Sequence, residues 1–396
     1  MQRLARGAEC GTMGEKKLNE GSRAMYSLGL YLHIPFCRAK CIYCDFYSLP
    51  HSEEKMEAYT AALCAQLARR APDAAAYCVD TVYFGGGTPS YLGDARLRRI
   101  LETLLSCYRV ESGAEITLEA NPDSARDVGA LRRLRAAGFN RISLGMQSAD
   151  DDELRRIGRV HTHGQTVEAV RAARAAGFDD LSLDLIYGLP EQTAARWQAS
   201  LAAAIALAPE HLSCYGLKVE EGTPLSARRG ELALPDDDAQ AEAYLTAVET
   251  LARAGYAQYE ISNFARPGHK SRHNLRYWQL QEYLGFGPGA HSDFGGRRFA
   301  CARDLGAYLA GEERLSEDAV PGADERRAER VMLSLRTALG LDPAALGLPA
   351  ERAEQVLREC AQHGLAERTG ARWRLTPQGF LVSNAVIVRV LEALGL

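Results

Sequence analysis

The segment Tyr31-Leu-His-Ile-Pro-Phe-Cys37-Arg-Ala-Lys-Cys41-Ile-Tyr-Cys44 joins an apolar, β-rich run directly to three closely spaced cysteines. The chain has ten cysteines in 396 residues and no export signal, so clustered cysteines indicate metal ligands rather than a disulfide scaffold. Three thiolates can hold a [4Fe–4S] cluster and leave one iron without a protein ligand. Zinc is the alternative, and it would need a fourth ligand such as His33 or Asp45.

The open iron position indicates what the cluster is for. A ligand with an amine and a carboxylate can chelate that iron, and the methionyl end of S-adenosylmethionine (SAM) carries both groups. A reduced cluster beside the sulfonium can then cleave a carbon–sulfur bond to give a 5′-deoxyadenosyl radical. The cysteine spacing therefore predicts reductive SAM chemistry.

Short β-rich runs alternate with amphipathic helical stretches over the first half of the chain, which is the pattern of a parallel sheet in an α/β fold. Six such units favour a partial (β/α)6 barrel over an open sheet. Cys37, the glycine run at 85–87, Glu119 and Gln147 each follow a different strand, and parallel folds gather their chemistry at that edge. The expected strands are 30–34, 81–84, 115–118, 141–144, 181–186 and 211–215, and the expected helices are 53–70, 95–107, 125–137, 165–176 and 194–207.

The pattern changes in the second half. A helix is expected at 236–254, followed by an aromatic, glycine-rich stretch at 256–292 with no clean period. Helical patterns at 324–339 and 351–363, a hairpin at 366–375 and a helix from Pro377 follow in the order of a winged helix. We expect four parts: a tail at 1–24, a barrel at 25–235, an accessory α+β region at 236–323 packed on the barrel, and a winged-helix-like domain at 324–396.

Composition limits the function classes. The formal net charge is −4, from 47 basic and 51 acidic side chains, so no nucleic-acid partner is expected. No apolar stretch is long enough to span a bilayer, so we expect a cytoplasmic protein with at most peripheral membrane contact. Residues 1–24 lack apolar periodicity, and we interpret them as a disordered tail or as the product of a start codon placed before Met25.

The cysteine spacing, its place after the first strand and the Tyr31–Cys37 sequence resemble the radical SAM superfamily. More narrowly, they resemble the branch that contains oxygen-independent coproporphyrinogen III oxidase and the HemW-type haem chaperones. The resemblance runs from about Leu30 to the C-terminus. It implies a radical SAM barrel, a [4Fe–4S] cluster on Cys37, Cys41 and Cys44, SAM, and a low-potential electron donor.

The resemblance also implies a SAM pocket. In Phe84-Gly-Gly-Gly-Thr-Pro-Ser90 the missing Cβ atoms allow the backbone to approach a ligand; the alternative is a tight strand-to-helix turn, and both can hold at once. Glu119 ends an apolar strand and needs a cation or a hydroxyl group as a partner. Asp184 alone would be ambiguous between a structural hydrogen-bond acceptor and a site residue. The implied SAM residues are Tyr31, Tyr43, Gly86, Gly87, Thr88, Glu119, Gln147, Arg159 and Asp184, of which Gln147, Arg159 and Asp184 contact a second SAM in the oxidase relatives.

One residue separates the two relatives. The oxidase pattern continues as CxxxCxxCxC, whereas this chain has Cys44-Asp-Phe46, as the HemW-type proteins do. The segment before the first strand is also short, whereas the oxidases have an ordered extension there. Both departures favour the chaperone.

Three blocks in the second half resemble the HemW group: 259–264, 273–278 (His-Asn-Leu-Arg-Tyr-Trp) and 287–292. The second block is associated with haem in that group. We expect an exposed His273 to ligate haem iron while Tyr277 and Trp278 pack on the macrocycle, with His291 as the next candidate. The alternative is that this aromatic stretch is a packed bridge between domains.

These observations predict a haem-binding radical SAM chaperone that transfers haem to acceptor haemoproteins of respiration. The first alternative is oxidative decarboxylation of coproporphyrinogen III. A radical SAM methyltransferase or cyclase with another substrate is a third possibility, disfavoured by the blocks at 273–278 and 287–292.

Overall fold

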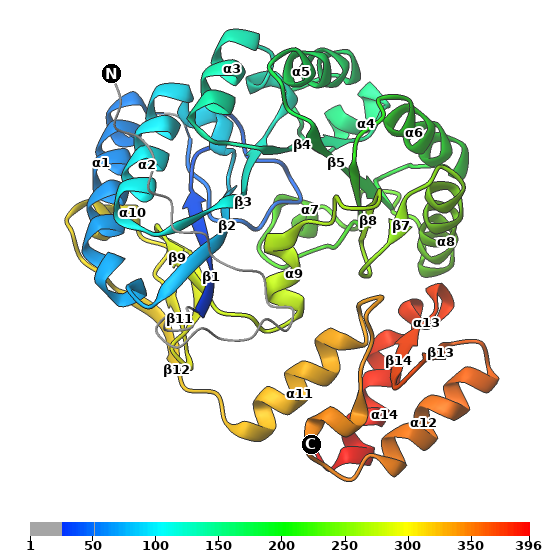
Figure 1. The fold of residues 1–396 in the computed structure, drawn as a ribbon. Helices are drawn as coiled ribbons and strands as arrows, with labels where there is room; N and C mark the ends of the chain where they lie inside the picture. The colour runs from blue at the N-terminus through cyan, green and yellow to red at the C-terminus, as the bar shows by residue number, and fades with distance from the viewer. Residues whose placement is uncertain (1–25, 51) are drawn as a thin grey trace.

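The computed structural model describes residues 26–50 and 52–396. Six parallel strands pair in chain order at the centre of a twelve-stranded sheet, and helices cover its outer face in an arc (Figure 1). The tail expected at 1–24 lies outside the described residues. The six central strands are β1 (Tyr26–Ile34), β2 (Tyr77–Gly86), β3 (Val110–Ala120), β4 (Arg141–Gln147), β5 (Asp180–Tyr187) and β6 (His211–Gly216).

Several helices begin at a capping side chain or end at a glycine that the sequence provides. Asp127 accepts hydrogen bonds from two backbone N–H groups at the start of α3 (Val128–Ala137), and Thr162 and Gln165 form a capping box at the start of α5 (His163–Ala175). Gly138 and Gly177 follow α3 and α5 with φ values of 126° and 92°, as the C-terminal glycines predict. The helices of the barrel region are α1 (Glu53–Arg70), α2 (Asp94–Cys107), α3 (Val128–Ala137), α4 (Asp151–Arg156), α5 (His163–Ala175), α6 (Ala194–Ala206), α7 (Pro224–Ala227) and α8 (Asp237–Arg253).

The sheet curves but does not close on itself. β1 pairs with β2 on one side and with β9 (Tyr283–Phe286) on the other, and β6 pairs with β5 and with β8 (Asn263–Ala265), so β1 and β6 do not pair with each other. The α/β fold with a partial (β/α)6 barrel is therefore confirmed. Leu28, Leu30, Leu32 and Ile34 of β1 are completely buried under the helices, which explains the apolar character of this strand.

The stretch at 256–292, for which the sequence gives no clean period, forms short elements that extend the sheet. β9 pairs parallel to β1, and β8 pairs antiparallel to β6. The helix α9 contacts β2. The elements of this region are β7 (Ala257–Gln258), β8 (Asn263–Ala265), α9 (Arg272–Trp278), β9 (Tyr283–Phe286), β10 (His291–Phe294), β11 (Arg297–Cys301), α10 (Leu305–Leu309) and β12 (Leu315–Ala319).

The C-terminal residues have a second hydrophobic core, built around Val331, Leu357, Trp373 and Val390. Two details differ from the sequence prediction: the first helix ends at Ser334 rather than near 339, and the last helical stretch is broken at Val382. The elements are α11 (Ala323–Ser334), α12 (Glu351–Gln362), β13 (Ala366–Thr369), β14 (Arg372–Leu375), α13 (Pro377–Leu381) and α14 (Ser383–Leu394). None of the helices in the described ranges combines the length and apolarity that a membrane span requires.

Candidate functional site: a cysteine loop over a polar cavity

The cysteine loop leaves the C-terminal end of β1 and is held at both of its ends. Cys37 N–H donates to the carbonyl of Leu49 (3.0 Å), and Leu49 N–H donates to the carbonyl of Pro35 (2.8 Å). In the middle of the loop, Ile42 N–H donates to Ile157 (3.2 Å). Cys37, Cys41 and Cys44 are all partly exposed and line one cavity of about 550 Å³.

The three thiols of the loop supply a donor set for a metal group. Among the described residues, no three His, Cys, Asp or Glu side chains converge as the ligands of one metal ion would. A zinc ion needs all of its ligands within about 2.0–2.3 Å of one centre. Cys37, Cys41 and Cys44 share one cavity, and three thiolates are the ligand set that a [4Fe–4S] cluster with one open iron needs. Burial raises the pKa of the Cys37 and Cys44 thiols, and a bound metal would favour the thiolates that it needs.

The glycine loop after β2 is locked against the cysteine loop. Gly87 N–H donates to the carbonyl of Ile34 (2.9 Å), and Thr88 N–H donates to that of Phe36 (2.8 Å). A Cβ atom on Gly87 would lie 2.8 Å and 2.9 Å from these two carbonyl oxygens, so only glycine allows this approach. The Thr88 hydroxyl also lies 3.3 Å from Cys37 Sγ. The loop is thus both a tight turn and part of the cavity wall.

Glu119, near the end of β3, is buried and is hydrogen-bonded to a hydroxyl group, as the sequence predicts. Oε1 accepts a hydrogen bond from the Tyr83 hydroxyl (2.6 Å), and Oε2 accepts one from Gly86 N–H (3.2 Å). Burial raises the pKa of Glu119 to about 7, although both hydrogen bonds oppose the shift. A carboxylate poised in this way, on the wall of the cavity, is suited to receive an ammonium group such as that of SAM.

Arg159 connects the cavity wall to the cysteine loop. Nη2 donates to Asn121 Oδ1 (2.8 Å) and to the carbonyl of Gly145 (2.6 Å), while Nη1 lies 3.6 Å from Cys41 Sγ. Its Nε is buried without a hydrogen-bond partner. Gln147 lies nearby with φ of 62°, a left-handed conformation that is uncommon outside glycine and that often marks functional sites.

Asp184 of β5 combines the two interpretations that the sequence left open. Its carboxylate accepts hydrogen bonds from the Ser143 hydroxyl (3.1 and 3.2 Å), and it also lines the cavity. Burial raises the pKa of Asp184, and hydrogen bonds from Ser213 and Ser143 partly oppose that shift. A second acid of raised pKa thus lies in the same cavity as Glu119.

The structure brings most of the sequence-derived SAM candidates together. Tyr31 is the exception among them: its hydroxyl lies 3.2 Å from His33 Nδ1, and its ring stacks on Tyr83 rather than lining the cavity. The candidates that line the cavity with the cysteines are Tyr43, Gly86, Gly87, Thr88, Glu119, Gln147, Arg159 and Asp184.

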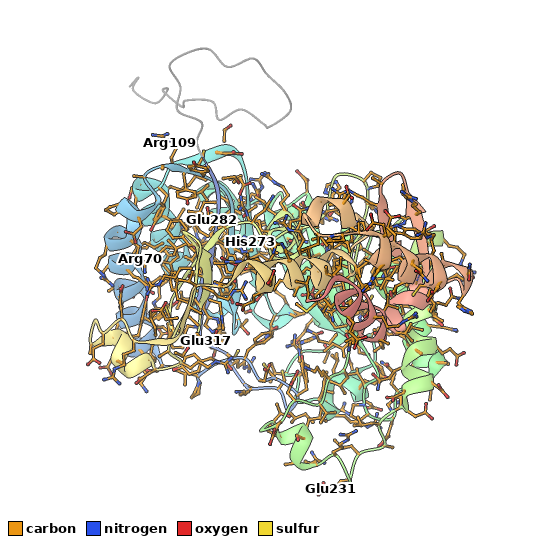
Figure 2. All side chains as sticks on the ribbon, turned by 90° about the horizontal axis from the view of Figure 1, so that it is seen from below. Arg70, Arg109, Glu231, His273, Glu282 and Glu317 are labelled. Carbon is orange, nitrogen blue, oxygen red and sulfur yellow. The ribbon has the colours of Figure 1, made fainter. Side chains whose placement is uncertain are left out.

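The expectation that His273 is exposed is wrong. The side chain is completely buried inside the molecule (Figure 2). Its Nδ1 lies 3.0 Å from Thr81 Oγ1 and its Nε2 lies 2.8 Å from the Tyr277 hydroxyl, so both ring nitrogens have partners. Burial, with a smaller effect of Arg276, lowers the pKa of His273 to about 3. In this conformation the imidazole cannot reach a haem iron, and none of His273, Tyr277, Trp278 and His291 lines the cysteine cavity.

Sequence reasoning missed several polar residues on the cavity wall. All of them except Asn121, which follows β3, lie on otherwise apolar strands, where alternate side chains point to the inner face of the sheet. A polar residue at every second position of a strand that is expected to be buried on both faces is the sequence signal that could have identified them. The missed residues include Tyr83, Asn121, Arg141, Ser143, Ser182, His211 and Ser213.

Comparison with protein-family models matches residues 31–204 to the radical SAM superfamily and residues 323–382 to the HemN C-terminal domain. The heme chaperone HemW of Mycobacterium tuberculosis is 40% identical over 375 residues, covering 91% of this chain and 93% of the relative. The heme chaperone HemW of Escherichia coli is 33% identical over 383 residues, covering 91% and 97%.

Among solved structures, the chain is similar to the coproporphyrinogen III oxidase HemN from Escherichia coli, a radical SAM enzyme. The TM-score is 0.79 at 25% identity, and the match covers 93% of this chain and 90% of the oxidase. The fold, the cysteine cavity and the full-length similarity to HemW relatives agree, and we conclude that the chain belongs to the HemW family of the radical SAM superfamily.

Proposed function

We propose that this chain is a haem chaperone that binds haem and transfers it to acceptor haemoproteins, with respiratory proteins as the acceptors. The observation that carries the proposal is the similarity, over nine tenths of the chain, to relatives named heme chaperone HemW. Phe46 supports it: this side chain is 60% exposed and lines the cavity two positions after Cys44. A phenyl ring there offers no thiol for the oxidase chemistry that the CxxxCxxCxC pattern accompanies.

The cavity residues fit the cofactors that the radical SAM family implies. Cys37, Cys41 and Cys44 would hold the [4Fe–4S] cluster, which when bound supplies the low-potential electron for SAM cleavage. Glu119 and the backbone at Gly86 would bind the methionyl group. We also propose a low-potential electron donor in the cytoplasm that reduces the cluster.

The haem site belongs elsewhere on the molecule. Of the four haem candidates, His273 is buried, and its Nε2 is hydrogen-bonded to the Tyr277 hydroxyl. These two residues therefore bind each other and not a ligand. His291, on β10, has a side chain that is 48% exposed and carries Nδ1 3.8 Å from a carboxylate oxygen of Glu317. We therefore propose His291 as the axial ligand, with the Glu317 carboxylate beside its ring.

Oxidative decarboxylation of coproporphyrinogen III is the second candidate function, favoured by the structural match to the oxidase.

An iron-porphyrin titration of the reconstituted protein tests whether the protein binds haem and whether His291 is the ligand. We expect saturable haem absorbance in the wild type, at least tenfold weaker binding in His291→Ala, and unchanged binding in His363→Ala, a surface control on the C-terminal unit. Equal binding by both variants would refute the role of His291, and a wild type that binds no haem would refute the chaperone function.

A further inference from the structure

Gln147 lies in a strained turn at the end of β4. Ser148 N–H donates to the carbonyl of Met146 (2.8 Å), which closes a three-residue γ-turn around Gln147. The φ of Gln147 is 62°, and a γ-turn whose central residue has a positive φ is the rare, strained form of this turn. Such a conformation persists only where the surrounding structure enforces it, so the contacts that hold Ser148 are needed to keep Gln147 on the cavity wall.

Glu153 of α4 supplies one of these contacts. The residue is completely buried, and its Oε2 accepts a short hydrogen bond from the Ser148 hydroxyl (2.6 Å). The hydroxyl oxygen of Ser148 accepts a hydrogen bond from Asp150 N–H (2.9 Å). Because Ser148 gives its single hydroxyl proton to Glu153, the Ser200 hydroxyl at 3.3 Å must donate to Ser148. The Ser148 side chain thus has three partners, and Glu153 is the only acceptor among them.

Glu153 also reaches the end of the next strand. Gln192 Nε2 donates to the same Oε2 (3.1 Å), and Gln192 Oε1 accepts a hydrogen bond from Gly188 N–H (2.8 Å), directly after β5. The other carboxylate oxygen of Glu153, Oε1, is buried without a hydrogen-bond partner in the part of the chain that the structure describes. One oxygen therefore accepts both side-chain hydrogen bonds, and an amide with its oxygen in that position would accept them equally.

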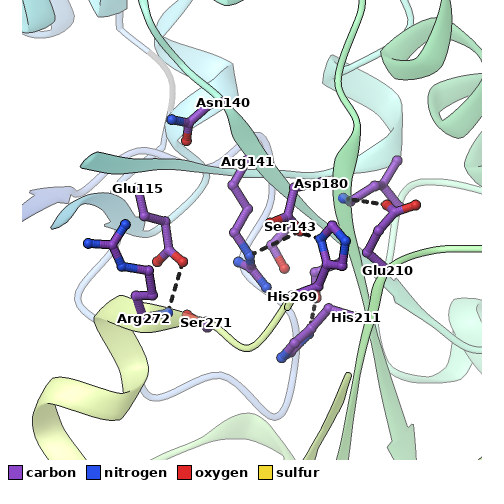
Figure 3. A network of polar contacts seen from close by, with 12 residues as sticks. Glu115, Asn140, Arg141, Ser143, Asp180, Glu210, His211, His269, Ser271 and Arg272 are labelled. Carbon is purple, nitrogen blue, oxygen red and sulfur yellow. Dashed lines mark hydrogen bonds and ion pairs between the residues drawn. The ribbon is translucent and has the colours of Figure 1, made fainter. Parts of the chain in front are cut away.

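A second buried carboxylate of the barrel has a similar role. Glu115 accepts a hydrogen bond from Arg272 N–H (2.8 Å), at the first residue of α9, and this helix carries Asn274 on the cavity wall (Figure 3). Glu153 stands in the same relation to Gln147. Neither acid lines the cavity itself, so each acts on it through another residue.

We propose that Glu153 is a positioning residue for SAM: through Ser148 it holds the strained turn that keeps Gln147 on the cavity wall. The inference rests on the SAM site proposed for this chain and adds to it a residue that touches no ligand. It requires an oxygen acceptor at position 153 rather than a negative charge, because both side-chain hydrogen bonds go to one oxygen.

Calorimetric titration of SAM into the anaerobically reconstituted, oxidised protein tests this role without turnover. Glu153→Leu removes the acceptor and should weaken SAM binding at least tenfold, whereas Glu153→Gln keeps an oxygen acceptor and should restore binding to within threefold of the wild type. Ser148→Ala removes the hydroxyl and should weaken SAM binding at least fivefold. Glu102→Leu, at an exposed acid of α2, is the surface control and should bind SAM as the wild type does.

A double variant separates positioning from a general effect on stability. Gln147→Ala should weaken SAM binding, and because Glu153 acts through Gln147, adding Glu153→Leu should weaken it no further. Iron content and melting temperature identify a variant that fails to fold. If Glu153→Leu is such a variant, the smaller change Ser148→Ala decides the test.

The outcomes distinguish this inference from the SAM site on which it rests. Wild-type SAM affinity in folded Glu153→Leu and Ser148→Ala, or in Gln147→Ala, would overturn the positioning role and leave the SAM site in place. Independent losses from Gln147→Ala and Glu153→Leu in the double variant would overturn it as well. A wild type that binds no SAM would overturn the SAM site itself and the positioning role with it.

Discussion

Replacing Glu119 by glutamine should change how stability depends on pH. The carboxyl is completely buried, and its pKa rises from 4.5 in the unfolded chain to about 7 in the folded one. Between these values the folded state binds more protons than the unfolded state, so stability falls as pH increases. Below 4.5 and above about 7 this residue contributes no further change.

The size of the effect follows from the two pKa values. Each pKa unit is worth about 1.4 kcal/mol, so ionising buried Glu119 costs the folded state about 3 kcal/mol by neutral pH. Glutamine has nearly the same shape and does not titrate. The unfolding free energy of Glu119→Gln should therefore increase relative to the wild type by about 3 kcal/mol between about pH 4.5 and pH 7.5.

Urea denaturation without SAM, followed by circular dichroism across that pH range, measures the difference. Tyr83→Phe is the matched comparison, because it removes the hydroxyl that donates to Oε1 and lowers the pKa of Glu119. This variant should steepen the pH dependence, whereas Glu119→Gln should flatten it. A constant difference between Glu119→Gln and the wild type at all pH values would refute the buried, high-pKa carboxyl.

Three other substitutions test separate parts of the structure. Cys41→Ala should abolish the iron cluster, measured as iron content and absorbance near 400 nm. Cys214→Ala, which replaces a buried thiol of β6, should keep the cluster, and zinc in place of iron would contradict it. Arg276→Ala breaks a buried ion pair with Asp80 and should cost about 3–5 kcal/mol of unfolding free energy. The double variant with Asp80→Ala should lose less than the sum of the two single losses, and additive losses would contradict the pair. Gly87→Ala should lose about 1–3 kcal/mol and part of its iron, because the new Cβ meets two backbone carbonyls; full iron loading at wild-type stability would contradict this packing.

Much of the site was predictable because parallel strands place their C-terminal ends at one edge of a sheet. The motif after β1, the glycines after β2 and Glu119 near the end of β3 could be assigned to one cavity from their order alone. The fold class followed from the same alternation of strands and helices. Tyr31 was harder, because its ring packs on Tyr83 of the neighbouring strand instead of lining the cavity.

The block at 273–278 shows where such reasoning fails. Its aromatic and histidine residues are compatible with an exposed haem site, but the face of a short helix is decided by distant partners. Thr81, 192 residues earlier in the chain, receives His273, and Glu115, 158 residues earlier, holds the backbone of α9.

The central claim is that this radical SAM protein carries haem rather than oxidising coproporphyrinogen. The most direct measurement follows two reactions of one anaerobically reconstituted preparation with SAM and a reductant: transfer of bound haem to an apo-haemoprotein, and formation of protoporphyrinogen from coproporphyrinogen III. We expect haem to appear in the acceptor and no protoporphyrinogen to form. Robust coproporphyrinogen conversion without haem transfer would contradict the account and assign the chain to the oxidase reaction.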